Sequence, residues 1–451
     1  MTLNDGYSIK KTNPGQTRLP GRGVLRYNAA SFGSRDFSHR NENLGRKVSL
    51  KNIFSSLRHR NYRLWFRGQL VSLFGTWMQV TAQGFLVYEL TGSSAYLGYV
   101  GFAAGLPSWF FMPLGGVIAD RIARRTLLLM TQTAMMALAL ILSGLTFLGL
   151  VRPWHIVVLA FLLGIANAFD APARHAFVPD MVGREDLTNA IALNSTIFNS
   201  ATATGPAVAG ITYALFGPGW CFLINAVSFL AVIAALLLMR LPRGEKSRAR
   251  LSAFHDLKEG FIYVLRHPMI RTLISLIIVT SLFGVSFAVL LPAWAVKILG
   301  GDAATNGWLQ SARGIGALIG ALIIASLGRF DFKGRLLTAG SLTFPVLLLV
   351  FSAVRRLPLS IFVLIAAGIA NIFIFNLANA LVQTLVRDEL RGRVMGLYSL
   401  TFFGFLPVGA LWIGTLAENV GEMGAVVLSS TIMLLLCAAV AWTVPELRRL
   451  R

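Results

Sequence analysis

The chain has 451 residues, of which 55% are hydrophobic and only 13% are charged, about half the charged share of a typical soluble domain. Its net charge of +22 would suit a nucleic-acid-binding protein, but the lysines and arginines lie in short segments between apolar runs and not in one basic stripe. The composition therefore favours a membrane protein and argues against a nucleic-acid partner.

Residues 1–63 form a polar and basic segment without a long apolar run. This composition predicts a disordered cytoplasmic tail. No apolar signal-peptide core is present in the segment, so we expect the first membrane helix to direct insertion.

Twelve apolar runs follow, each long enough for a helix to cross about 30 Å of hydrocarbon. They predict an all-α membrane protein with twelve transmembrane helices in two six-helix, pseudo-symmetric halves, residues 64–239 and 268–444, before a short tail, 445–451. The predicted spans are Leu64–Tyr88, Tyr96–Ala119, Leu127–Leu150, Trp154–Ala173, Ala190–Phe216, Trp220–Met239, Ile270–Val296, Thr305–Leu327, Leu336–Val354, Leu359–Val386, Gly392–Leu416 and Ala425–Val444.

The basic linker between the halves, residues 240–267, carries apolar side chains at helical spacing. Phe254, Leu257, Phe261, Val264 and Leu265 follow this pattern. It predicts an amphipathic helix at the membrane surface.

The distribution of positive charge predicts the orientation. With the N-terminus inside, the outer loops hold 4 lysines and arginines and the inner segments hold 34. Such an excess marks the cytoplasmic side, so we expect both termini in the cytoplasm of a bacterial cell, with the chain in the inner membrane.

The two halves share a short sequence repeat. Ser72-Leu-Phe-Gly75 recurs as Ser281-Leu-Phe-Gly284, at equivalent places in the first and seventh spans. Transporters with internal repeats place the solute site at the interface between the repeats, so we expect a central pathway between the halves.

The segment from Gly116 to Arg125 resembles the loop signature of the major facilitator superfamily, with Asp120-Arg121 followed by Arg124 and Arg125. Ala123 replaces the second glycine of that signature. Further stretches, among them NYRLWFRGQLVSLFG, FDAPARHAFVPDMVGREDL and DELRGRVMGLYSL, resemble the transmembrane secretion effector branch, which includes the enterobactin exporter. The resemblance runs from about Asn61 to Val444.

This resemblance implies a conformational latch in the loop after the second span. A carboxylate at Asp120 would face the N-terminus of the eleventh helix, whose unpaired N–H groups attract an anion, and Arg124 would pair with Asp170. Alternatively, the arginines only anchor the topology. The latch residues are Gly116, Asp120, Arg121, Arg124, Arg125 and Asp170.

The fifth span carries Gly205-Pro206 and Gly210, which partly resemble a motif of exporters in the superfamily. Small residues permit close helix packing, and proline bends a helix. A simple proline kink, as in any transporter, gives the same pattern.

Polar residues line one face of several spans and predict the solute pathway. Arg313 is the clearest intramembrane charge, and such a group is a functional candidate; a structural pairing with backbone carbonyls is the alternative. Interhelical hydrogen bonds would explain the other polar residues equally well. The predicted pathway residues are Gln79, Gln83, Asn194, Asn199, Gln310, Arg313, Asn376 and Asn379.

These observations predict a secondary transporter that works by alternating access. We expect export of a siderophore or drug-like molecule coupled to protons through Asp170, for which a static salt bridge is the alternative. Uptake or facilitated transport of another small solute is the second functional hypothesis.

A membrane-embedded enzyme is a weaker hypothesis, because the six histidines lie in the tail and at span ends. No phosphate-binding GxxxxGK[ST] motif occurs, which disfavours an ATP-driven pump. We expect no catalytic residue, metal or cofactor. The expected partners are a small-molecule substrate, protons and the lipid bilayer, and the expected state is a monomer.

Overall fold

The computed structural model describes residues 54–240, 253–328 and 330–450. At residues 113, 116, 117, 119–121 and 253–257 it describes the backbone but not the side chains. Most of the predicted tail therefore lies outside the described residues.

The first six predicted spans correspond to seven α-helices, preceded by a 3₁₀ turn, Ser55–Arg58. Pro107 follows Leu106 and divides the second span into two helices. Proline lacks an amide hydrogen and so begins a new helix more readily than it continues one. The helices are α2 Arg60–Thr91, α3 Ser94–Gly105, α4 Pro107–Arg121, α5 Arg124–Phe147, α6 Pro153–Phe177, α7 Leu187–Phe216 and α8 Pro218–Leu238.

The linker contains helix α9, Ala253–Arg266, which leads into the second six spans. The seventh span is irregular: α10, Pro268–Val279, continues as the π-helix Thr280–Gly284, the 3₁₀ segment Val285–Leu290, α11, Leu291–Ala293, and the π-helix Trp294–Ile298. The remaining helices are α12 Ala303–Leu327, α13 Lys333–Ala353, α14 Leu357–Leu385 and α15 Arg391–Thr443.

Nine helical segments among the described residues are long and apolar enough to cross a membrane. One of them, Asp388–Thr443, has the length of two spans and breaks at Gly421, which has a φ of 78°. The bent pair α3–α4 and the more polar α7 also have span length. With these additions, the described residues account for the twelve predicted spans, and the all-α fold class is confirmed.

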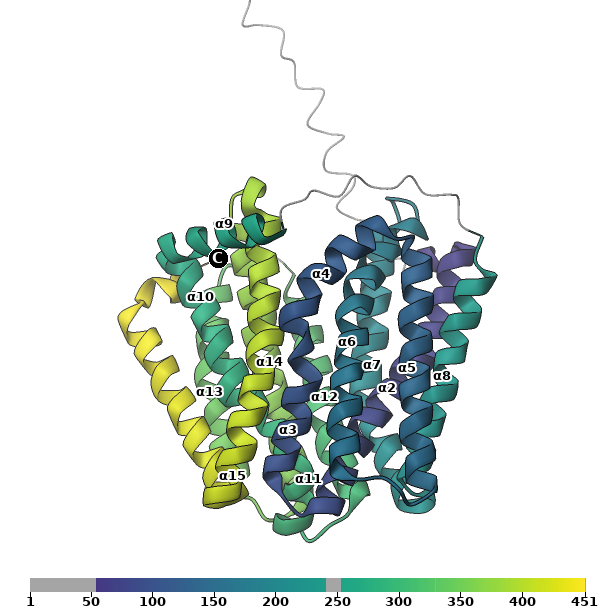
Figure 1. Cartoon of the computed structure of the whole chain (residues 1–451). Helices are drawn as coiled ribbons and strands as arrows, with labels where there is room; N and C mark the ends of the chain where they lie inside the picture. The colour runs from purple at the N-terminus through teal and green to yellow at the C-terminus, as the bar shows by residue number, and fades with distance from the viewer. Residues whose placement is uncertain (1–53, 241–252, 329, 451) are drawn as a thin grey trace, which may run out of the picture. The chain divides into compact units, whose positions relative to one another are not determined.

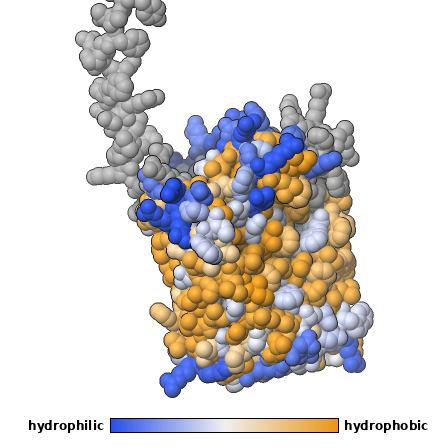
Figure 2. Space-filling view, turned by 90° about the vertical axis from the view of Figure 1, so that its left-hand side faces the viewer, coloured by the Kyte–Doolittle hydropathy of each residue, from blue (hydrophilic) through white to orange (hydrophobic). Residues whose placement is uncertain are grey.

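A broad hydrophobic band covers the face in Figure 2, and hydrophilic residues gather at its two ends. Large apolar side chains such as Leu215, Phe362 and Trp442 are exposed. A soluble protein rarely exposes so continuous an apolar surface, whereas a lipid bilayer covers it.

Helices α2 to α8 and helices α10 to α15 stand side by side as an N-terminal half, residues 60–238, and a C-terminal half, residues 268–443 (Figure 1). Helix α9 lies at one end of the helices and α11 at the other. We call these ends the α9 end and the α11 end.

Candidate transport pathway and its closed end

Helices α7 and α12, one from each half, pack backbone against backbone near the α11 end. A Cβ atom added to Gly210 would lie 2.5 Å from the carbonyl oxygen of Ala303, and one added to Gly307 would lie 2.5 Å from that of Pro206. These distances leave no room for a side chain, so small residues set the closeness of the two halves here.

The Gly205-Pro206 and Gly210 motif of the fifth span takes part in two different contacts. Pro206 and Gly210 face the other half, whereas Gly205 packs against Trp77 of α2 within its own half. Beside them, the N–H of Ala207 donates a hydrogen bond to the hydroxyl of Ser311 at 2.9 Å.

Helices α3 and α4 meet α15 in the same manner. A Cβ atom on Gly414 would lie 2.6 Å from the Cα of Gly98. Nearer the middle of the span, Nε1 of Trp109 donates to the carbonyl oxygen of Gly404 at 2.9 Å. Two helix pairs thus join the halves from the α11 end inward.

Two carboxylates complete the closure at the α11 end. Glu422 is buried, accepts a hydrogen bond from Ser94 at 2.8 Å and pairs with Lys297 at 2.7 Å. Glu418 accepts one from Ser93 at 2.8 Å. Both serines belong to the N-terminal half and both acids to the C-terminal half, so the bonds cross between the halves.

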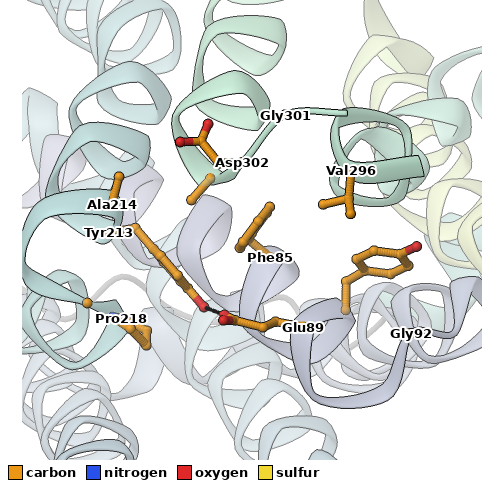
Figure 3. Close-up of a pocket in the computed structure, with 12 residues that line it drawn as sticks. Phe85, Glu89, Gly92, Tyr213, Ala214, Pro218, Val296, Gly301 and Asp302 are labelled. Atoms are coloured by element: carbon orange, nitrogen blue, oxygen red, sulfur yellow. Dashed lines mark hydrogen bonds between the residues drawn. The ribbon is translucent and has the colours of Figure 1, made fainter. Parts of the chain in front are cut away.

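A depression of about 790 Å³ lies beside this closure, between α2, the α7–α8 turn and the segment before α12. Figure 3 shows Phe85, Tyr213 and Val296 in its wall and Asp302 at its edge. Glu89 accepts a hydrogen bond from the Tyr213 hydroxyl within the N-terminal half.

Among pairs of described residues, the hydrogen bonds between the halves all lie from the α11 end to Trp109 and Gly404. The described hydrogen bonds between the halves thus gather toward the α11 end.

The predicted pathway residues of α2 are both buried. Gln79 accepts a hydrogen bond from Asn225 of α8 at 2.6 Å. Gln83 lies one turn along the same stripe. In this state Gln79 therefore bonds within the N-terminal half.

The predicted asparagines of α7 and α14 are more open. Asn194 accepts a hydrogen bond from the Tyr62 hydroxyl at 3.2 Å, and Asn199 is partly buried. Asn376 is exposed and Asn379, which accepts a hydrogen bond from Gln383, is partly buried. Asn194 thus takes part in an interhelical bond, and a contact of the two α14 asparagines with a solute stays a prediction.

Gln310 and Arg313 lie together on α12. Nη1 of Arg313 donates to Oε1 of Gln310 at 2.9 Å, and the guanidinium lies over the Phe287 ring, 5.4 Å from its centre. The side chain is partly buried. The predicted pairing of Arg313 with backbone carbonyls is not among its contacts with the described residues.

Asp170 is fully buried in a network of three helices of the N-terminal half. It accepts hydrogen bonds from Thr131 at 2.9 Å and Gln132 at 2.8 Å, both on α5. Arg174, one turn along α6, pairs with it and also donates to Gln69 of α2 at 3.2 Å. The buried charge is therefore matched by a cation and by hydroxyl and amide donors.

The predicted latch falls partly outside the described side chains. This holds for Gly116, Asp120 and Arg121, whose backbone ends α4. The contact of Asp120 with the start of α15 stays a prediction.

The predicted pair of Arg124 and Asp170 is wrong for this state. Arg124 binds Asp180 at 2.9 Å and the carbonyl oxygen of Ala176 at 3.0 Å. Arg174 lies on the same helix as Asp170, four residues further along, at the spacing that brings two side chains together. It therefore takes the place beside the Asp170 carboxylate that was predicted for Arg124. Arg125 donates to the carbonyl oxygen of Leu237 at 3.0 Å.

A family model described as transmembrane secretion effector matches residues 51–450. The chain belongs to this family. The family and the relatives below are transporters and not enzymes, so the chain is a transporter.

Curated relatives align with the transporter over nearly all of their own length. It is 27% identical to the multidrug efflux pump Tap of Mycolicibacterium fortuitum, covering 83% of this chain and 93% of Tap. It is 24% identical to the staphyloferrin A transporter of Staphylococcus aureus, covering 80% and 90%. It is 25% identical to the enterobactin exporter EntS of Shigella boydii, covering 87% and 94%.

Solved structures support the fold. The nucleoside transporter NupG is similar with a TM-score of 0.65 at 15% identity, over 86% of this chain and 98% of NupG. A bacterial homologue of the lysosomal transporter Spinster gives 0.65 at 14% identity, over 89% and 98%.

Sequence reasoning missed the closure at the α11 end. Glu418 marked the outer end of a span in the sequence, but neither its bond to Ser93 nor the pair of Glu422 and Lys297 was predicted. The sequence did contain a sign of this closure, because two acids, Glu418 and Glu422, flank Gly421 at the predicted turn between the last two spans.

Proposed function

We propose that this transporter exports a small organic molecule from the bacterial cytoplasm by alternating access, in exchange for protons. Two of the relatives above are named for efflux or export, which supports the direction. The observation that carries the mechanism is the closed α11 end, where the halves meet through glycines and through two acids, Glu418 and Glu422.

We place the α9 end in the cytoplasm and the α11 end outside. The segments that the sequence predicts to be cytoplasmic carry 34 of the 41 lysines and arginines, as cytoplasmic segments do, and α9 belongs to one of them. In this orientation the present state is closed to the outside, and export requires the contacts between α7 and α12 and between α3 and α15 to open.

We assign the exchanged proton to Asp170. A buried acid inside a transporter is a common proton site, and protonation would remove the charge that holds Arg174. Because Arg174 also binds Gln69 of α2, its release would loosen α6 from α2. The rest of the predicted latch, Gly116, Asp120, Arg121, Arg124 and Arg125, would stabilise the opposite state, which is open to the outside.

Export is tested by expressing the chain in a bacterial strain that lacks its main efflux pumps. A panel of macrolides, other antibiotics and siderophores is added, and growth inhibition and cell content are measured. Expression should lower the cell content of at least one compound. An unchanged content across the panel, with the protein inserted, would contradict export.

Proton coupling is tested in vesicles with an imposed pH gradient and a compound that the panel identifies. Wild type should concentrate the compound against its gradient, whereas Asp170→Asn should only equilibrate it. Asp186→Asn is the matched control, since Asp186 also pairs with a basic side chain, that of His59, but lies outside the predicted latch. Concentrative transport by Asp170→Asn would leave Asp170 as a static ion pair.

A further inference from the structure

Arg313 has no carboxylate partner among the described residues. Its single hydrogen bond to a described residue goes to the neutral side chain of Gln310. None of the ion pairs between described residues includes it. A charge within an apolar helix bundle costs free energy unless it is paired or hydrated. An unpaired guanidinium at this position is therefore a candidate for binding a ligand.

The guanidinium is held in position and not left mobile. Gln310 fixes Nη1 at 2.9 Å, and the Phe287 ring lies against the guanidinium at 5.4 Å from its centre. Phe287 belongs to the 3₁₀ segment where the seventh span departs from α-helical geometry, a departure common at functional sites. Since a guanidinium carries five N–H donors, most of them remain for a ligand.

Arg313 lies on α12 between two residues that contact α7 of the other half. Ser311 bonds to α7 through the Ala207 N–H, and Gly314 packs against the carbonyl oxygen of Thr202. A solute that enters from the α9 end would meet the closure at this level.

We propose that Arg313, oriented by Gln310 and Phe287, recognises an anionic oxygen group of the transported molecule, such as a carboxylate or phenolate. The proposal deepens the proposed function, because it names the chemical class of the solute. A planar guanidinium binds a carboxylate through two parallel hydrogen bonds. The same positive charge would repel a cationic solute.

The test uses two small probes of the same shape, benzoate and benzamide, and the purified full-length chain. The shift in thermal unfolding temperature with probe concentration gives a dissociation constant, and sodium chloride keeps the ionic strength equal. We expect benzoate to bind wild type at least about tenfold more tightly than benzamide does.

Two substitutions locate the effect. Arg313→Gln should remove the preference for benzoate. Gln310→Glu should remove it as well, since a carboxylate next to the guanidinium takes the place of the ligand. The new ion pair should stabilise this variant, so a loss of the preference would not result from unfolding. Arg356→Gln, at an exposed arginine before α14, should keep the preference.

Equal binding of the two probes to wild type, or an unchanged preference in Arg313→Gln or Gln310→Glu, would overturn the proposal. The assay measures binding without transport, so a failure of export does not affect it. Conversely, if the exported compounds in the panel are all cations, export stands and the recognition of an anion by Arg313 is wrong.

Discussion

Asp170 and Glu422 are the two buried carboxylates in the described part of the chain, and their surroundings differ. All partners of Asp170 lie in the N-terminal half. Glu422 has Lys297 in its own half and Ser94 in the other. Loss of charge at Asp170 therefore acts within one half, whereas loss of charge at Glu422 acts on the contact between the halves.

Glu422→Gln should favour the state that is open at the α11 end. The substitution keeps the size of the side chain but removes charged hydrogen bonds to Lys297 and Ser94, each worth about 1.5–3 kcal/mol. A cysteine placed at Ser311, in a chain whose two native cysteines are replaced by serine, should then react faster with a thiol reagent added from outside.

Glu89→Gln is the matched control for this experiment. Glu89 also lies at the α11 end and bonds to a hydroxyl, that of Tyr213, but both belong to the N-terminal half. In Glu89→Gln, the cysteine at position 311 should be labelled at the same rate as in the protein that has Glu at both 89 and 422. If Glu422→Gln labels no faster than Glu89→Gln, the bond between Ser94 and Glu422 does not hold the halves together.

At the residue scale, the sequence predicted which residues are unusual better than it predicted their partners. Arg313 and Asp170 stand out as charges inside apolar runs. The bond between Ser94 and Glu422 joins residues 328 positions apart, and the helical periodicity of each span carries no information on such a contact. Likewise, nothing in the stripe of Gln79 indicates that its partner is Asn225.

At the element scale, the contact between α7 and α12 depends on glycines at the two surfaces that meet. Gly210 and Gly307 each face a backbone carbonyl of the other helix. Because the contact belongs to the closed state, extra volume there should shift the balance between states and not unfold the protein.

Gly210→Ala should therefore impair transport with normal membrane insertion. The added Cβ would lie 2.5 Å from the oxygen of Ala303, and overpacking of this kind costs about 1–3 kcal/mol. Efflux of a panel compound should fall by roughly tenfold, the factor that 1.4 kcal/mol represents. Gly144→Ala, on α5 with nothing within 4 Å of its Cβ, should keep full efflux; equal efflux in both variants would contradict the role of this contact.

The elements themselves were largely predictable, and the exceptions have physical reasons. Hydropathy predicts span position because a helix in lipid must satisfy its own backbone. It does not report the break at Leu106 before Pro107, since apolar residues continue on both sides. It also misses the π and 3₁₀ turns from Thr280 to Ile298, because packing, and not composition, sets them.

At the scale of the whole molecule, the proposed orientation in the membrane rests on the distribution of charge and is open to a direct test. Reporter fusions at Ser247 and at the C-terminus should report the cytoplasm, and a fusion at Gly421 should report the outside. Gly421 forms the turn between the two membrane-spanning helices that make up α15, so an insertion there does not interrupt either helix. The opposite pattern would reverse the assignment of the α9 and α11 ends.

The fold class and the number of spans followed from the sequence, but the state of the molecule did not. Two states of a transporter share one sequence and one set of helices and differ in which end is closed. The closure at Gly98 and Gly414 became evident only when the distance between their backbones was known.

Export by alternating access requires the α11 end to open, so efflux should stop when that end is locked. Ser93 and Glu418 lie on opposite halves with their side-chain oxygens 2.8 Å apart. Cysteines at both positions, in a chain without its two native cysteines, are joined with a short reducible crosslinker, and efflux of a panel compound is measured in vesicles. Crosslinking should abolish efflux and reduction should restore it, while each single cysteine treated with the same reagent should stay active. Undiminished efflux by fully crosslinked protein would contradict alternating access through this end.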